Sequence, residues 1–479
     1  MEKYNEKYDM KKTDFKFEDS LPTPCDNSKS VEPGSMFFAL SKNEDLKKKH
    51  IDEAIANGAK IIVVENGEKI SEAKNGVKFI SVENVRIALA KTASEFFGSN
   101  FDYKTAVTGT NGKSSTADIL RQIWITSGIE AASIGTLGVI TKTDREKLPH
   151  NMTSPDCLEL HKILHKLCKR EIKNIVLEAT SQGLDQHRLD PIKFDVCAFT
   201  NFSRDHLDYH KTTENYLNAK MRLFSESAHE KSVFIVNADD PCSEKIREIA
   251  KNRGVKCVDY GHAANDIKIL GVNPEESNQQ VSVDFFGTKI SFALPLPGTF
   301  QIHNAMCAAA ASYFSGVSVE KIFEGLEKLQ QIDGRLELVA KNIYVDYAHT
   351  PDALQNAILS LKNLKKNRMI TVFGCGGNRD KEKRILMGRV AEKFSDVVIV
   401  TDDNPRDEDP QQIRKMILEG CPNAGEIGDR KIAIESAVKM LSEGDVLLVA
   451  GKGHETYQII GKELQESDDK KIITDAVKK

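Results

Sequence analysis

The sequence has few of the features that mark secreted, membrane or nucleic-acid-binding proteins. Its nine cysteines are scattered without a C-x-x-C pair, which argues against a disulfide framework or a zinc site. No apolar run reaches membrane-spanning length, and the charged N-terminus has no apolar signal segment. The net charge of −4 implies no polyanion-binding surface. We therefore expect a cytoplasmic, monomeric protein with reduced thiols and neither membrane nor nucleic acid as partner.

Length and composition indicate a multidomain soluble enzyme or binding protein. The chain has 479 residues, of which 40% are hydrophobic and 29% charged. A chain of this length is too long for one hydrophobic core. We expect three α/β domains, covering residues 1–98, 99–331 and 332–479. The first domain contains no group of residues typical of catalysis. Its sequence therefore fits either a domain that only packs against the others or a domain that binds a ligand.

The most informative stretch is Lys104–Thr116, KTAVTGTNGKSST. A buried strand is expected to end near Val107, and an apolar pattern typical of a helix begins at Ser114. A strand, a glycine-bearing loop and a helix in this order hold a nucleotide polyphosphate. Lys113 would reach the β- and γ-phosphates and the Ser114 hydroxyl would bind Mg²⁺. The expected ATP-binding residues here are Gly109, Thr110, Asn111, Gly112, Lys113, Ser114 and Ser115.

The usual phosphate-loop pattern is only partly matched, because Val107 stands where G-x-x-x-x-G-K-[ST] has its first glycine. An ordinary glycine turn with a surface lysine is therefore the alternative. Further along, the strand 173–177 ends in Glu178. A carboxylate at the C-terminal end of a parallel strand lies on the ligand side of the sheet. It is either a Mg²⁺ ligand or a solvated acid.

Three polar positions in the central region remain ambiguous on pattern alone. The histidines and aspartates of 205–210 fit either a loop network or metal and phosphate binding. Lys220 lies on the amphipathic helix 214–224, where periodicity favours a solvated side chain. An ammonium group cannot ligate Mg²⁺, because it has no free lone pair. Asn304 precedes the alanine-rich helix 305–312, where a helix-start cap is the simplest interpretation.

The last domain alternates strands with helices, which predicts a second parallel sheet. The loops after strands 343–345, 369–373, 397–401 and 446–450 should gather on one edge of it. Gly374–Gly377 lacks the G-x-G-x-x-G spacing, so NAD binding is not favoured. On its own, the segment 404–406 is a turn with a surface arginine.

Six motifs, in order, resemble those of the Mur ligases. They are TGTNGKS (108–114), LEATSQGLDQHRL (177–189), FTNFSRDHLDYH (199–210), NAKMRLF (218–224), DNPR (403–406) and GKGHE (451–455). The chain is most similar to the members that add the third residue of the stem peptide. The resemblance implies an α/β fold with a small UDP-binding N-terminal domain, a central P-loop-type parallel-sheet ATPase domain and a C-terminal Rossmann-like amino-acid-binding domain.

The implied activity is ATP-dependent amide ligation. In the members that contain DNPR, meso-2,6-diaminopimelate is added to UDP-N-acetylmuramoyl-L-alanyl-D-glutamate through an acyl phosphate, in peptidoglycan precursor synthesis. The alternatives are an L-lysine-adding or folylpolyglutamate synthase-like ligase, or a non-catalytic nucleotide-binding homologue. The DNPR and GKGHE loops argue against a folylpolyglutamate synthase.

The resemblance also assigns site residues. Catalysis would rest on Lys113, Glu178, His206 and Lys220. Mg²⁺ would be bound by Ser114, Glu178, His206 and Lys220, the last as a carbamate with the oxygen ligands that Mg²⁺ prefers. In the ATP site, Asn304 would contact adenine, Arg335 the phosphates and Asp346 the ribose. The UDP-sugar-peptide would contact Ser28, Asn43, Thr153, Ser154, Thr180, Gln186 and Arg188. Diaminopimelate would contact Arg379, Asp403, Asn404, Pro405, Arg406, Gly451 and Glu455, with Arg406 on its distal carboxylate and Glu455 on an ammonium group.

Overall fold

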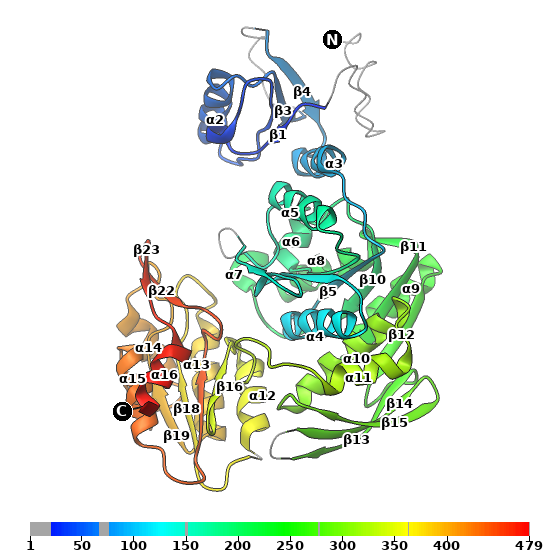
Figure 1. The fold of residues 1–479 in the computed structure, drawn as a ribbon. Helices are drawn as coiled ribbons and strands as arrows, with labels where there is room; N and C mark the ends of the chain where they lie inside the picture. The colour runs from blue at the N-terminus through cyan, green and yellow to red at the C-terminus, as the bar shows by residue number, and fades with distance from the viewer. Residues whose placement is uncertain (1–20, 67–75, 149–151, 276–277, 363, 479) are drawn as a thin grey trace. The chain divides into compact units, whose positions relative to one another are not determined.

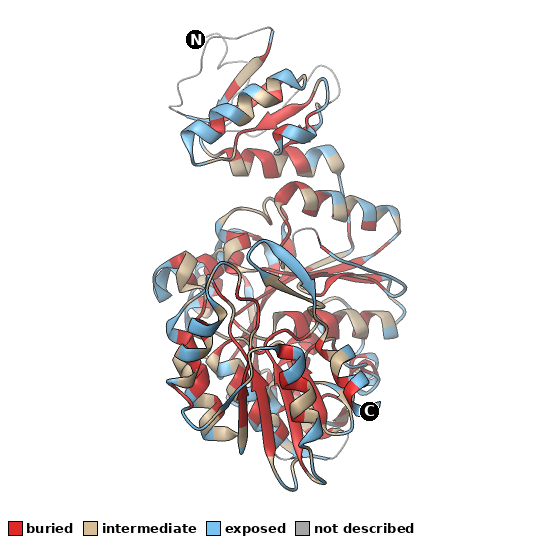
Figure 2. Cartoon of the chain, turned by 90° about the vertical axis from the view of Figure 1, so that its left-hand side faces the viewer, coloured by how far each residue is buried: buried red, intermediate tan, exposed pale blue. Residues whose placement is uncertain are grey.

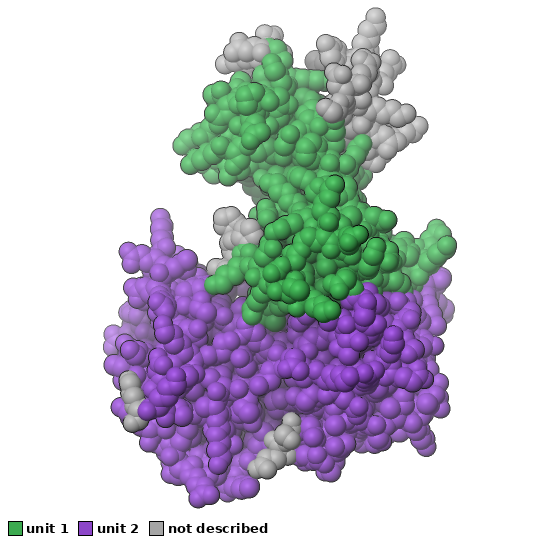
Figure 3. All heavy atoms as spheres, viewed as in Figure 1, with its two compact units in different colours: residues 1–106, 130–195, 219–232 green, residues 107–129, 196–218, 233–479 purple. Residues whose placement is uncertain are grey.

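The computed structural model describes residues 21–66, 76–148, 152–275, 278–362 and 364–478. The chain forms two compact units (Figure 3). Unit 1 comprises residues 1–106, 130–195 and 219–232, and unit 2 comprises residues 107–129, 196–218 and 233–479. The chain passes between the units within the strands β5 (Tyr103–Thr108), β10 (Phe194–Phe199) and β11 (Ala228–Asn237), within helix α8 (Thr213–Ser225), and between residues 129 and 130. The expected domain boundaries near residues 98 and 331 stay predictions.

Unit 1 begins with a parallel sheet in the order β1-β2-β3-β4. Its strands are Pro24–Cys25, Met36–Phe38, Ile61–Glu65 and Lys78–Val82, and its helices are α2 (Glu44–Ala56) and α3 (Val85–Phe97). Successive strand residues face opposite sides. Ile62 therefore packs with Ala54 of α2, whereas Val63 packs with Leu89 of α3.

The rest of unit 1 contains strands in the order β9-β6-β7-β8. They are β6 (Ala131–Gly135), β7 (Gly138–Ile140), β8 (Arg145–Glu146) and β9 (Asn174–Glu178), with helices α5 (Cys157–Lys169) and α6 (Ser181–Asp185). Strand β9 pairs in parallel with β6 and is buried along its whole length. Such continuous burial is typical of parallel strands, and it places Glu178 at a C-terminal strand end.

In unit 2, helix α4 (Lys113–Thr126) packs against α10 (Thr299–Phe314) and α11 (Val319–Glu327). A β-rich segment of this unit consists of the antiparallel strands β13 (Ile267–Pro274), β14 (Gln279–Phe285) and β15 (Thr288–Leu294). Before it, β11 (Ala228–Asn237) and β12 (Lys256–Gly261) pair in parallel, and α9 (Ser243–Arg253) connects them.

Unit 2 also contains a six-stranded sheet in the order β16-β17-β21-β18-β19-β20 (Figure 1). Its strands are Glu337–Ala340, Ile343–Asp346, Val446–Ala450, Met369–Phe373, Val397–Val400 and Gly425–Glu426, all parallel except β16. The strand interiors are buried, and the surrounding helices are partly exposed (Figure 2). This order explains why the loops after β17, β18, β19 and β21 share one edge.

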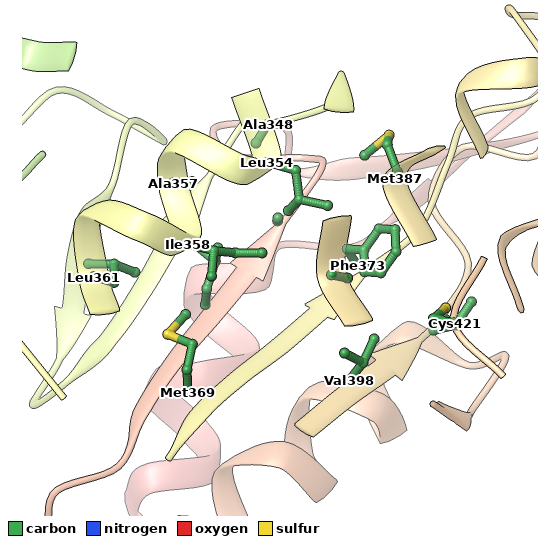
Figure 4. Close-up of a cluster of buried hydrophobic side chains, with 14 of the residues drawn as sticks. Ala348, Leu354, Ala357, Ile358, Leu361, Met369, Phe373, Met387, Val398 and Cys421 are labelled. Atoms are coloured by element: carbon green, nitrogen blue, oxygen red, sulfur yellow. The ribbon is translucent and has the colours of Figure 1, made fainter. Parts of the chain in front are cut away.

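Helices cover both faces of this sheet. On one face lie α12 (Pro351–Lys362), α13 (Glu382–Phe394) and α14 (Pro410–Leu418), and on the other lie α15 (Arg430–Lys439) and α16 (Asp469–Lys478). Ile358, Met369, Phe373 and Met387 belong to the first core (Figure 4). The expected second parallel sheet is therefore confirmed. The nine cysteines are all free. Among the described residues, no helix combines the length and apolarity needed to cross a membrane.

Candidate active site

The loop between β5 and α4 places backbone amides and the Lys113 side chain at the start of helix α4. Helix α4 starts with Gly112 at its N-cap, which provides no side-chain oxygen for the first amides of the helix. The Lys113 ammonium group folds back over the loop and donates hydrogen bonds to the carbonyl oxygens of Gly109 (2.9 Å) and Thr110 (2.8 Å). Amides at a helix N-terminus, together with a lysine, form a phosphate-binding arrangement. The geometry therefore favours the phosphate loop over an ordinary turn.

The segment after β10 fixes the shape of this loop. The amides of Thr110 and Asn111 donate to the backbone and side-chain oxygens of Asn201, at 2.8 and 2.9 Å. Thr200 Oγ1 donates to the carbonyl of Asn111 at 2.6 Å. A Cβ at Gly109 would lie 1.9 Å from Thr200 Oγ1, so the close approach requires glycine. Sequence reasoning missed Thr200 and Asn201 as supports, although both lie within the FTNFS motif.

Asn304 lies inside helix α10 and does not cap it. The helix begins at Thr299, six residues before the expected start, so the helix-cap interpretation is wrong. The buried Asn304 amide donates to Gln301 Oε1 at 2.9 Å. Its Oδ1 lies 2.4 Å from where a Cβ on Gly112 would stand, and Gly112 has a φ of +85°. The structure thus brings Asn304 directly against the phosphate loop, and it adds Gln301 as a support that the sequence did not indicate.

Arg335 and Asp346 lie beside the same loop within unit 2. Arg335 Nη2 donates to Ser114 Oγ at 3.0 Å, and its guanidinium carbon lies 4.6 Å from the centre of the Tyr347 ring. The Asp346 carboxylate accepts from the amides of Leu336 and Ala348, each at 2.7 Å. Burial raises the pKa of Asp346 to about 6, although the Arg335 charge opposes that rise. These residues join the loop and the C-terminal sheet in one arrangement.

Glu178 is 3% exposed, so the solvated-acid interpretation is wrong. Its Oε1 accepts from the amide of Thr136 at 2.8 Å and its Oε2 accepts from Thr136 Oγ1 at 3.1 Å. Thr136 Oγ1 also lies 2.9 Å from Thr153 Oγ1. A Cβ at Gly135 would stand 2.1 Å from Glu178 Oε1. The carboxylate is therefore held in one orientation by Thr136, which sequence reasoning missed.

Lys220 is 1% exposed, so the solvated-face interpretation from helical periodicity is wrong. A buried ammonium group is costly unless it is paired or chemically neutralised. His206, by contrast, is partly exposed and has a φ of +53°. Its Nε2 lies 3.4 Å from Asp205 Oδ2. Burial of Asp205 opposes ionisation, but the nearby charges of His206, Lys383 and His349 outweigh it and hold the pKa of Asp205 well below its ordinary value.

The donors predicted for Mg²⁺ are distributed over both units. Glu178 and Lys220 belong to unit 1, and Ser114 and His206 belong to unit 2. Within the described part of the chain, no group of three or more histidine, cysteine or acidic side chains forms a preassembled metal cage. The hydroxyl and carboxylate oxygens present suit a hard cation. Lys220 fits such a site only after its amine has become a carbamate.

A cavity of about 460 Å³ in unit 1 brings together three residues predicted to bind the UDP-sugar-peptide: Ser28, Gln186 and Arg188. Arg188 Nη1 donates to the carbonyl of Ser154 at 2.9 Å, and Ser154 Oγ lies 2.9 Å from Thr180 Oγ1. His50 and Arg86 also line the cavity and were not predicted.

Asn43 is used differently from the other predicted UDP-sugar-peptide contacts. Its Oδ1 accepts from the amide of Leu46 at 2.9 Å and so caps helix α2. Asn43 is not among the described residues that line the cavity. Its contact with the nucleotide sugar stays a prediction, and helix capping accounts for the contact that its side chain makes in the structure.

The predicted diaminopimelate contacts lie at the C-terminal edge of the second sheet. Asn404 Nδ2 donates to Glu455 Oε2 at 2.9 Å, which joins the loops after β19 and β21. Arg406 Nη1 donates to the carbonyl of Gly377 at 2.9 Å, in the loop after β18. A Cβ at Gly451 would stand 2.6 Å from Asp403 Oδ2. Arg379 is more exposed, and its Nη1 lies 4.0 Å from Asp208 Oδ2.

The charges around this edge are incompletely balanced. Burial, and after it the nearby Arg379 charge, lowers the pKa of Arg406. Among the described residues, no carboxylate lies within 4.0 Å of the Arg406 guanidinium. Burial and the negative charge of Asp403 raise the pKa of Glu455 to about 7. A zwitterionic ligand with one carboxylate and one ammonium group would complement Arg406 and Glu455 at once.

Comparison with known proteins gives consistent matches. The Mur ligase middle domain matches residues 107–312, and the Mur ligase glutamate ligase domain matches residues 334–453. A UDP-N-acetylmuramoyl-L-alanyl-D-glutamate–2,6-diaminopimelate ligase from Mesorhizobium japonicum is 42% identical over 452 residues, covering 93% of each chain. A solved structure of a ligase with that name is 30% identical with a TM-score of 0.69, covering 98% of both chains. A MurF ligase from Thermotoga maritima, solved with ADP, shares the fold at 20% identity, with a TM-score of 0.64 and coverage of 95% and 97%.

Proposed function

This chain belongs to the Mur ligase family, and on that premise we propose that it is the ATP-dependent ligase that adds meso-2,6-diaminopimelate to UDP-N-acetylmuramoyl-L-alanyl-D-glutamate in peptidoglycan precursor synthesis. The observation that carries this proposal is the hydrogen bond between Asn404 and Glu455 beside the half-buried Arg406. Glu455 provides an anion for the distal ammonium group of diaminopimelate, and Arg406 provides a guanidinium group for its distal carboxylate. Lysine lacks that carboxylate, so it would leave Arg406 without an anionic partner.

The reaction forms one amide bond and consumes one ATP. The D-glutamyl γ-carboxylate takes the γ-phosphoryl group of ATP, and the amine of diaminopimelate then displaces phosphate from the resulting acyl phosphate. ADP, phosphate and the tripeptide leave. The amides at the start of α4 and the Lys113 ammonium group stabilise the charge on the transferred phosphoryl group, where positioning and electrostatics dominate. Arg335 binds nucleotide phosphates, Asn304 contacts adenine and Asp346 contacts ribose.

The proposed metal is Mg²⁺, held by Ser114, Glu178, His206 and the carbamate of Lys220. When bound, it supplies positive charge to the phosphates. The hydrogen bonds from Thr136 orient the Glu178 carboxylate for this role. The nucleotide sugar occupies the cavity lined by Ser28, Gln186 and Arg188. In this assignment, the N-terminal, central and C-terminal domains span residues 1–98, 99–331 and 332–479.

An amino-acid panel in a phosphate-release assay tests the proposal. Phosphate release from ATP should require both the UDP-dipeptide and an amino acid, and diaminopimelate should support it far better than L-lysine. Release with folate and glutamate would identify a folylpolyglutamate synthase. Tight ATP binding without release under any condition would identify a non-catalytic homologue.

The substrates are small soluble molecules, and the proposal places the protein in the cytoplasm. It further takes the protein to be a monomer with neither membrane nor nucleic acid as partner. The net charge of −4 supports the absence of a nucleic-acid surface. Sedimentation of the purified protein tests the oligomeric state, and a dimer at micromolar concentration would contradict this part of the proposal.

A further inference from the structure

Arg406 has a backbone conformation that is uncommon for an arginine. Its φ is +53°, in the left-handed region that favours glycine and asparagine. Non-glycine residues persist there when surrounding contacts hold them, often at ligand sites. The side chain leaves such a backbone in a direction different from that of an extended residue. Whatever holds this backbone therefore also aims the guanidinium group.

The hairpin formed by β22 (Tyr457–Ile460) and β23 (Glu463–Glu466) holds it. The amide of Arg406 donates to the carbonyl of Ile459 at 3.0 Å. The carbonyl of Arg406 accepts from the amide of Gly461 at 2.8 Å. Both backbone polar groups of Arg406 are thus bonded to the hairpin, which follows directly after the GKGHE motif in the chain.

The same hairpin also donates hydrogen bonds to the N-terminal end of the DNPR segment. The side-chain amide of Gln458 donates to the carbonyl of Asp403 at 2.6 Å and reaches the carbonyl of Asp402 at 3.3 Å. The amide of Ile459 donates to Asn404 Oδ1 at 2.9 Å, while Asn404 Nδ2 points to Glu455. Gln458 thus contacts this segment through its side chain, whereas Ile459 contacts it through its backbone amide.

We propose that Gln458 is a positioning residue for amino-acid selection, which holds the carbonyl end of the DNPR segment so that Asn404 and Arg406 face the distal carboxylate of the incoming amino acid. The inference rests on the proposed function. Gln458 does not contact the substrate, and it acts through the DNPR segment that it holds. Loss of its amide frees one end of the segment, whereas the backbone bonds from Ile459 and Gly461 remain. The hairpin should therefore still fold in a Gln458 variant.

The chain provides a matched control within the same hairpin. Gln465 is the cross-strand neighbour of Gln458. It is exposed, whereas Gln458 is partly buried. The two glutamines carry the same carboxamide group on paired strands of the hairpin. Gln458→Ala and Gln465→Ala thus remove the same group from the same hairpin and differ in the bonds to the DNPR segment.

The test measures steady-state constants for diaminopimelate, L-lysine and ATP in the wild-type protein, Gln458→Ala, Gln458→Glu and Gln465→Ala. We expect Gln458→Ala to raise the KM for diaminopimelate about tenfold, as for a lost hydrogen bond of about 1.4 kcal/mol. The KM for ATP should stay within twofold. The preference for diaminopimelate over lysine should fall, because lysine does not use the distal carboxylate contact. Gln458→Glu keeps the side-chain length, but its carboxylate cannot donate a hydrogen bond, so it should behave like Gln458→Ala. Gln465→Ala should match wild type.

An unchanged ratio of kcat/KM for diaminopimelate to that for lysine in both Gln458 variants would overturn the inference. So would an equal loss in Gln465→Ala, or a uniform fall in kcat with all substrates, because these results indicate general destabilisation. The proposed function fails separately, if wild-type protein does not ligate diaminopimelate. Normal wild-type ligation with unchanged discrimination in the variants rejects the role of Gln458 alone.

Discussion

Ser114 Oγ accepts a hydrogen bond from Arg335 Nη2 at 3.0 Å, although the two residues are separated by 221 positions in the chain. The bond joins the first turn of α4 to the segment that enters the C-terminal sheet. In the proposed reaction, this is where the phosphates of the nucleotide meet the amino-acid-binding domain.

Replacing Arg406 should affect the amino-acid site selectively. Charge-assisted hydrogen bonds are worth about 1.5–3 kcal/mol, so Arg406→Ala should raise the KM for diaminopimelate about 10- to 100-fold. The KM values for ATP and the UDP-dipeptide should change little. Arg389→Ala, an exposed arginine on α13, serves as the control and should match wild type. An unchanged KM for diaminopimelate would rule out the carboxylate contact.

The pH dependence of amino-acid binding should follow Glu455. Burial and, after it, the negative charge of Asp403 together raise its pKa to about 7. An ammonium group is bound by the ionised carboxylate, so kcat/KM for diaminopimelate should fall as pH drops below 7. Glu455→Gln should lower the value at pH 8 and remove this part of the profile. A wild-type profile that is flat between pH 6 and 8 would contradict the assignment.

The same group has the opposite effect on folding stability. The unfolded carboxyl has an ordinary pKa near 4.5, below its folded value of about 7. Between these values the folded protein keeps a proton that the unfolded chain releases. The contribution of Glu455 is therefore present below pH 4.5 and lost as pH rises through 7. Denaturant titrations of wild type and Glu455→Gln at pH 5 and 8 measure it, and wild type should lose stability relative to the variant on going to pH 8.

Glycine should be required at position 112 for two reasons: the positive backbone φ, and the close approach of the Asn304 side chain. The φ of Gly112 is +85°, and a Cβ there would stand 2.4 Å from Asn304 Oδ1. Gly128, at the end of the same helix, has a φ of +87° with nothing within 4 Å of the added Cβ. Gly112→Ala and Gly128→Ala should therefore both lose about 1–2 kcal/mol of unfolding free energy from backbone strain. The KM for ATP should rise in Gly112→Ala alone. Equal ATP constants in the two variants would exclude Asn304 from the nucleotide site.

Lys220 should function as a negatively charged carbamate and not as an ammonium group. Lys220→Ala should lower turnover at least 100-fold, because the proposed carbamate oxygens are lost. A small carboxylate such as formate, added at high concentration, should restore part of the activity, since it can place oxygen atoms in the vacated space. Lys220→Arg keeps the positive charge and should stay inactive with or without formate. Full activity in Lys220→Arg would show that the carbamate is unnecessary.

The sequence alone determined the phosphate loop, the strand that ends in Glu178, the second parallel sheet and the motifs that indicate the family. These features are local, because each depends on a run of neighbouring residues with a fixed spacing. The strands Met369–Phe373 and Val446–Ala450 were predicted to the residue for that reason. Their buried interiors are apolar except for Thr371, and they are bounded by glycine or by polar residues.

Tertiary structure decided which polar side chains are buried and what holds them. Helical periodicity placed Lys220 in solvent, yet packing of α8 buries it. Three hydrogen bonds join residues that are 42 to 89 positions apart in the sequence. Thr136 donates to Glu178, Thr200 donates to the phosphate loop, and Gln458 donates to the DNPR segment. Such contacts arise from strand order and loop approach, and no local pattern encodes them. The sequence therefore specified the reacting groups, and the fold specified their orientation.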